Sequence, residues 1–154
     1  MEGIFKKIKK LLDSKGINYK ITEHEPVFTS KQAAKVRGVD LNLGAKSLLL
    51  KADKNFVLVV LPGGKKLSSK KLKRFLGTKS LRFATQEEVK EIMGCEIGSC
   101  YPFGLIVGLR VVVDSSLLEN KMIFFNPGVH NKTIEIKTED YFKVKDLERG
   151  EIIE

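Results

Sequence analysis

Over residues 46–61 the chain reads Lys46-Ser47-Leu48-Leu49-Leu50-Lys51-Ala52-Asp53-Lys54-Asn55-Phe56-Val57-Leu58-Val59-Val60-Leu61. Two short apolar runs with a polar segment between them are typical of paired strands. We therefore predict strands over residues 47–51 and 56–61, joined by the turn Asp53-Lys54-Asn55 as an antiparallel hairpin. Such a hairpin excludes a purely parallel, doubly wound sheet.

Helical and strand patterns alternate on both sides of this hairpin. Apolar stripes and following glycines predict helices over residues 3–15, 29–36, 68–76 and 85–93. Thr29 and Thr85 each precede a Gln or Glu by three residues, which is the pattern of a capping box. Further strands are predicted over residues 18–23, 81–84, 111–113, 121–126 and 132–137. In the first of these, Tyr19 and Ile21 are expected to point inward, and a short helical piece is expected after Asp114-Ser115-Ser116.

Together these elements predict an α/β protein of the α+β type, with a mixed, largely antiparallel sheet or partly closed barrel and helices packed outside. The chain is long enough for one domain with a core of its own, so we expect residues 1–154 to form a single domain. No apolar run approaches the ~20 residues that span a bilayer, and no signal-like segment follows Met1. We therefore expect a cytoplasmic protein without a membrane partner.

The net charge of +9 is concentrated in one part of the chain. Residues 1–83 hold 20 Lys and Arg against 6 Asp and Glu, whereas residues 84–154 hold 8 against 13. The densest part is a basic stretch without acids, consisting of Lys65, Lys66, Lys70, Lys71, Lys73 and Arg74. A solvated helix face is one interpretation, and a polyanion-binding surface is the other. Because no aromatic residue lies between these cations, the second interpretation means phosphate contacts rather than base stacking.

The two cysteines do not form a metal motif. Cys95 and Cys100 are five residues apart, which is neither C-x-x-C nor half of a zinc site, so no metal is expected. Cys100 lies within the loop Gly98-Ser99-Cys100-Tyr101-Pro102-Phe103-Gly104. A catalytic thiol would need a base, and His24 and His130 are the available histidines. We favour a role for Cys100 in shaping a pocket.

Lys46 and the loop 98–104 are the candidate site. A lysine at the start of an apolar strand is placed to hold an anion or a carbonyl oxygen, although pairing with a carboxylate is the plain structural alternative. Gly98 lets the main chain approach a ligand closely, and Pro102 fixes the far end of the loop.

These two segments, with Glu23-His24-Glu25-Pro26-Val27-Phe28-Thr29-Ser30 and Phe125-Asn126-Pro127-Gly128, resemble the YbaK and prolyl-tRNA synthetase-associated editing domains from about His24 to Ile136. The resemblance implies hydrolysis of aminoacyl-tRNA that carries the wrong amino acid, without metal or cofactor. It places the family's active-site marks on Lys46, Gly98 and Pro102. It also implies a free-standing enzyme that acts in trans on tRNA(Pro) charged with alanine, cysteine, serine or threonine, with prolyl-tRNA synthetase as a candidate partner.

The resemblance further implies substrate-assisted chemistry. Backbone amides of residues 98–101 are candidate oxyanion donors, the vicinal ribose hydroxyl is a candidate for orienting the water, and Lys46 is expected to hold the terminal phosphate or the aminoacyl carbonyl rather than act as a base. Expected substrate contacts are His24, Thr29, Ser99, Cys100, Tyr101, Phe103, Asn126, Gly128 and His130, although Tyr101 and Phe103 also suit the core. Expected tRNA contacts are Lys65, Lys66, Lys70, Lys71, Lys73 and Arg74.

Two other functions remain open from the sequence. The same pocket and basic stretch would serve a module that binds a tRNA, aminoacyl or nucleotide end without chemistry. In a structural or interaction protein, the lysines would serve only solubility. We favour the hydrolase because the resemblance spans several segments in order.

Overall fold

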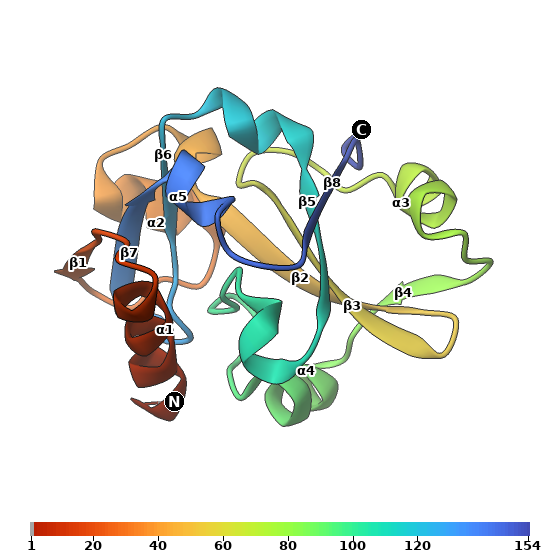
Figure 1. Ribbon diagram of the computed structural model, residues 1–154, viewed down its shortest axis with the longest axis horizontal. Coiled ribbons are helices and arrows are strands. Elements are labelled where there is room, and N and C mark those ends of the chain that lie inside the picture. The colour runs from red at the N-terminus through yellow and green to blue at the C-terminus, as the bar shows by residue number, and fades with distance from the viewer. Residues whose placement is uncertain (1) are drawn as a thin grey trace.

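The computed structural model of the protein describes residues 2–154, which fold around two sheets (Figure 1). The larger sheet has the strand order β4-β2-β3-β5-β8, and the smaller has the order β1-β7-β6. The strands are β1 (Lys20–Glu23), β2 (Ala45–Ala52), β3 (Asn55–Pro62), β4 (Leu81–Phe83), β5 (Arg110–Asp114), β6 (Met122–Phe125), β7 (Lys132–Lys137) and β8 (Leu147–Gly150). The α-helices are α1 (Glu2–Ser14), α2 (Ser30–Arg37), α3 (Ser69–Leu76), α4 (Gln86–Met93) and α5 (Thr138–Tyr141), with 3-10 turns η1 (Leu41–Leu43), η2 (Gly104–Val107) and η3 (Ser115–Glu119).

The predicted hairpin is confirmed as the centre of the larger sheet. β2 and β3 pair antiparallel over their whole length, from Ala45 opposite Pro62 to Ala52 opposite Asn55. β4 adds antiparallel to β2, whereas β5 and β8 add parallel on the other side. The mixed fold class is therefore confirmed, and the parallel half of the sheet agrees with helical segments that lie between its strands.

β3 is buried on both faces because apolar layers cover both sides of the larger sheet. Leu58 and Val60 contribute to a large core that also contains the apolar stripe of α1, while Val57, Val59 and Leu61 contribute to a smaller core under α3. This division follows from the alternation of side chains along a strand. Leu72, the buried residue of α3, packs into the smaller core.

The helix boundaries follow the capping signals. α4 has the complete predicted capping box, in which Thr85 and Glu88 satisfy each other's backbone N–H groups. At α2, Thr29 Oγ1 accepts from Gln32 N–H, but the Gln32 side chain accepts from the Phe28 N–H instead of closing the box on Thr29. The glycines Gly38, Gly77 and Gly94 end their helices in the left-handed conformation.

One sequence-based expectation was wrong in detail, and one strand was not predicted. Ile21 does not point inward: all four residues of β1 are exposed, and among residues 2–154 β1 pairs only with β7, at one edge of the smaller sheet. β8 was not predicted, since Leu-Glu-Arg-Gly has no strand periodicity, and its place is set by pairing with β5. No helix in the described part of the chain is long and apolar enough to span a membrane.

Candidate functional site

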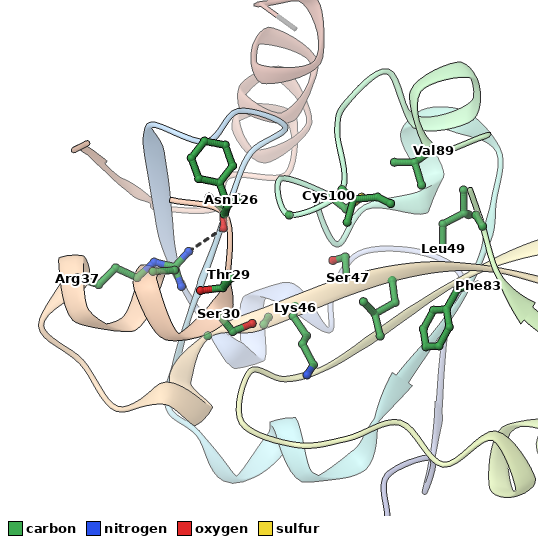
Figure 2. Close-up of a pocket in the computed structure, with 18 residues that line it drawn as sticks. Thr29, Ser30, Arg37, Lys46, Ser47, Leu49, Phe83, Val89, Cys100 and Asn126 are labelled. Atoms are coloured by element: carbon green, nitrogen blue, oxygen red, sulfur yellow. Dashed lines mark hydrogen bonds between the residues drawn. The ribbon is translucent and has the colours of Figure 1, made fainter. Parts of the chain in front are cut away.

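A cavity of about 450 Å³ lies where one edge of β2 is left open (Figure 2). β4 pairs only with residues 50–52 of β2, and a parallel bridge between Gly44 and Phe124 brings β6 beside the start of β2. Between these two strands, residues 46–48 have no strand partner on that side within the described chain. The start of α2, the loop at Gly98 and the end of β6 complete the wall. The cavity therefore lies between the two sheets, beside the predicted hairpin.

The lining divides into a polar half and an apolar half. The polar half consists of Thr29, Ser30, Arg37, Lys46 and Asn126, and the apolar half of Leu49, Phe83, Ala84, Val89, Ile97 and Cys100. Figure 2 shows the labelled members of these groups on opposite sides of Ser47. Such a cavity has room for one charged or sugar-like end and one apolar side chain of a ligand.

Arg37, at the end of α2, was not anticipated from the sequence. Its Nε donates to Thr133 Oγ1 at 2.9 Å and its Nη2 to Asn126 Oδ1 at 3.1 Å. No carboxylate lies within 4.0 Å of it in residues 2–154, and burial lowers its pKa to about 10, so it remains charged at neutral pH. A basic residue in the last turn of a helix is ordinarily explained by the helix dipole, which gave no reason to single it out.

Lys46 also lacks an acidic neighbour. Its side chain is half-buried, burial lowers its pKa, and no carboxylate oxygen in the described chain lies within 4.0 Å of its Nζ. The alternative in which Lys46 is tied to a structural carboxylate is therefore not realised. Figure 2 shows Lys46 and Ser47 pointing to opposite sides of β2, as neighbours in a strand must.

Gly98 adopts a conformation that requires glycine. Its φ is +95°, and a Cβ there would lie 2.7 Å from the Phe28 carbonyl oxygen. The Ser99 N–H is committed to the Glu96 carbonyl, whereas the N–H groups of Gly98, Cys100 and Tyr101 have no acceptor within the described chain. Of these three residues, Gly98 and Cys100 line the cavity. The candidate oxyanion donors therefore narrow to Gly98 and Cys100.

Several predicted contacts support the loop from behind and do not line the cavity. Tyr101 and Phe103 are fully buried in the large core, where the Tyr101 hydroxyl donates to the Met93 carbonyl at 2.7 Å. The Pro102 carbonyl accepts from the Tyr141 hydroxyl at 2.8 Å. Core packing accounts for both side chains, so the expectation that Tyr101 and Phe103 contact the substrate is not proposed further. Ser99 and Gly128 likewise lie outside the lining residues.

The histidines lie behind the cavity wall. His24 Nδ1 donates to the Glu25 carbonyl at 2.7 Å, so its Nε2 accepts from Thr133 Oγ1 at 2.7 Å, and that oxygen accepts in turn from Arg37. His24 thus positions Arg37 through Thr133. His130 Nδ1 donates to the Val27 carbonyl, and its ring packs 4.5 Å from that of Phe28. Neither histidine lines the cavity.

The cysteines are free and buried, with their sulfurs 3.6 Å apart. The contact with Cys95 and burial both raise the pKa of the Cys100 thiol, which argues against a nucleophilic thiolate. No group of three or more His, Cys, Asp or Glu side chains in the described chain is arranged to hold a metal ion.

The basic stretch is separate from the cavity. α3 lies at the opposite end of the larger sheet from α2 (Figure 1). Lys65, Lys66, Lys70, Lys71 and Arg74 are exposed, and Lys73 is half-buried. Lys71 Nζ donates to the Ile153 carbonyl, and none of the six lines the cavity.

Known proteins are similar to this chain in both sequence and fold. A model of the aminoacyl-tRNA editing domain matches residues 24–144. The multifunctional Ser/Thr-tRNA deacylase ProXp-y of Escherichia coli K12 is 31% identical over 143 residues, covering 90% of this chain and 86% of that protein. The prolyl-tRNA editing protein ProX of Acetoanaerobium sticklandii is 27% identical over 139 residues, covering 86% and 85%. A solved structure of a proposed trans-editing enzyme for prolyl-tRNA synthetase superposes with a TM-score of 0.87 at 25% identity, covering 98% and 97%.

Proposed function

The chain belongs to the aminoacyl-tRNA editing domain family, and from that membership we propose that it is a trans-acting aminoacyl-tRNA deacylase. The proposed substrate is tRNA(Pro) that carries a small non-cognate amino acid, namely alanine, cysteine, serine or threonine. We further propose that residues 1–154 act as one editing domain, with prolyl-tRNA synthetase as a partner.

The charge of the cavity is the observation that carries this proposal. Arg37 and Lys46 line its polar half, and none of the described lining residues is acidic. A buried cation without a counter-ion is costly unless a ligand neutralises it. The phosphate next to the terminal adenosine of an aminoacyl-tRNA would supply that negative charge, while the aminoacyl side chain would occupy the apolar half.

The proposed reaction is hydrolysis of the ester between the amino acid and the terminal ribose. Water attacks the ester carbonyl, the carbonyl oxygen becomes an oxyanion, and the ribose oxygen leaves with a proton. The free N–H groups of Gly98 and Cys100 are the proposed oxyanion donors, and loss of one such donor typically costs roughly a hundredfold in rate. The vicinal ribose hydroxyl would orient the water, so no protein nucleophile is required.

The remaining predicted residues have supporting roles in this proposal. Lys46 would bind the phosphate or the ester carbonyl, Pro102 would hold the oxyanion loop in place, and Thr29 and Asn126 would contact the ribose end. We propose that the basic stretch from Lys65 to Arg74 contacts tRNA phosphates away from the cavity, because five of its six cations are exposed.

The test is release of amino acid from tRNA(Pro) charged separately with alanine, cysteine, serine, threonine and proline. The wild type is compared with Lys46→Ala and with Lys51→Ala, a matched control on the same strand that does not line the cavity. The proposal expects release of at least one small amino acid, which is lost in Lys46→Ala and kept in Lys51→Ala. Saturable, salt-sensitive tRNA binding without any release would instead indicate a binding module.

A further inference from the structure

Ser47 lies at the junction of the two halves of the cavity (Figure 2). The residue is 8% exposed, and its Oγ is buried with no hydrogen-bond partner in the described chain. Thr138 carries the other such oxygen, but it does not line the cavity. A hydroxyl that has lost its water without gaining a partner is unfavourable, so an unpaired one in a cavity wall points to a ligand that pairs with it.

The neighbours of Ser47 cannot satisfy this hydroxyl. Ala45 and Leu49 lie on the same face of β2, and Ala84 and Val89 lie in the apolar half of the lining. The nearby polar atom of that half is the Cys100 thiol, which is a weak donor and already contacts the Cys95 sulfur. Ser47 therefore supplies the one hydroxyl in the part of the cavity that suits an aminoacyl side chain.

The backbone of Ser47 faces the same space. Toward β3, Gly63 N–H donates to the Gly44 carbonyl, and toward β4, Ala84 N–H donates to the Leu49 carbonyl. Backbone groups alternate between the two sides of an antiparallel strand, so those of Ser47 point to the same side as those of Leu49. No strand pairs with residue 47 on that side within residues 2–154. A ligand lying along β2 thus meets a donor, an acceptor and a hydroxyl from one residue.

We propose that Ser47 determines specificity by binding the side-chain hydroxyl of the aminoacyl group, and that the preferred substrates carry a β-hydroxy amino acid, serine or threonine, rather than alanine. This inference rests on the proposed deacylation at this cavity. Serine has three staggered rotamers, so rotation about its Cα–Cβ bond aims the hydroxyl at different parts of the wall. An alanyl group would leave the Ser47 hydroxyl unpaired, whereas a seryl or threonyl group would pair it. Sites built around such a hydrogen bond discriminate against analogues that lack the partner.

The experiment measures kcat/KM for one tRNA charged with alanine, serine or threonine, in the wild type, Ser47→Ala and Ser14→Ala. Ser14 is a matched control on α1, where its hydroxyl donates to the Leu11 carbonyl far along the chain from the cavity residues. We expect the wild type and Ser14→Ala to favour serine and threonine over alanine. In Ser47→Ala, kcat/KM for these two is expected to fall about tenfold or more, with little change for alanine.

The outcomes separate this inference from the proposed function. Release of alanine as fast as serine by the wild type would overturn the role of Ser47 while leaving deacylation intact, and so would an equal loss for all three amino acids in Ser47→Ala. No release from any charged tRNA would overturn the proposed function itself. Because Ser47→Ala removes an unpaired hydroxyl, its thermal midpoint should match or exceed that of the wild type, and failure to fold would also contradict the inference.

Discussion

Replacing Arg37 by methionine should weaken substrate binding without weakening the fold. Methionine keeps an unbranched side chain of similar reach and removes the charge. The lowering of the Arg37 pKa from 12.5 to about 10 corresponds to roughly 3 kcal/mol against the charged form. The two hydrogen bonds that Arg37 donates, to Thr133 and Asn126, have a charged donor and offset this by about 1.5 kcal/mol each. The net change in unfolding free energy of Arg37→Met should therefore lie near zero.

Substrate binding by Arg37→Met should weaken, although the free energy of unfolding hardly changes. A charge-assisted hydrogen bond to a phosphate is worth about 1.5–3 kcal/mol, which predicts a rise in KM of roughly ten- to a hundredfold. Loss of one phosphate contact with single-stranded nucleic acid should also reduce the salt dependence of log KM by about 0.7. Arg37→Lys keeps a charge but loses the planar fork, so its KM should fall between the two. Arg149→Met, on β8, is the control for loss of an arginine elsewhere.

Thermal unfolding and deacylation at several salt concentrations provide the assay. If Arg37→Met unfolds several degrees lower while KM and its salt dependence stay unchanged, Arg37 is a structural residue and the electrostatic reasoning about the cavity is wrong.

Three further predictions concern the loop, pH and the thiols. Gly98→Ala should lower both kcat and the thermal midpoint, because its φ of +95° and the approach to the Phe28 carbonyl leave no room for a Cβ; normal values for both would contradict this account of the loop. Glu88 has its pKa lowered from 4.5 to about 2, first by Arg82 and then by the Thr85 N–H, so its stabilising effect should be present above pH 4.5 and be lost as the pH falls toward 2. Acid unfolding monitored by circular dichroism should show this change in the wild type but not in Glu88→Gln. Cys100→Ser should retain most of the deacylation activity, since the thiol is not the proposed nucleophile; loss of turnover with an unchanged KM would restore that alternative.

Local patterns were sufficient to predict much of the fold. The hairpin and the helix ends depend on residues close together in the chain, so their signals survive without tertiary knowledge. β8 and the exposed Ile21 depend on which strands lie at the edge or beside β5, and no local pattern carries that information.

The residues of the candidate site also fall into those that the sequence predicted and those that it did not. Lys46 and the Gly98 loop were found because they belong to recognisable segments. Arg37 and Ser47 were missed because their significance depends on what is absent around them: a carboxylate in one case and a hydrogen-bond partner in the other. The role of Ser47 is also hard to recognise in the sequence because the residue lies in an apolar strand, where a single hydroxyl is common.

The length of β4 determines how much of the edge of β2 stays open to the cavity. β4 ends at Phe83, and Thr85 begins the cap of α4 two residues later. In the register that places Leu50 opposite Phe83, a β4 that continued for four more residues would pair with β2 as far as Lys46 and fill the open edge with backbone. The N-cap of α4 at Thr85 therefore limits how far β4 can pair with β2. An insertion before Thr85 that moved the start of α4 along the chain would be expected to add hydrogen bonds between β4 and β2 and to close the cavity. At this position, selection for a more stable sheet and selection for the cavity therefore oppose each other.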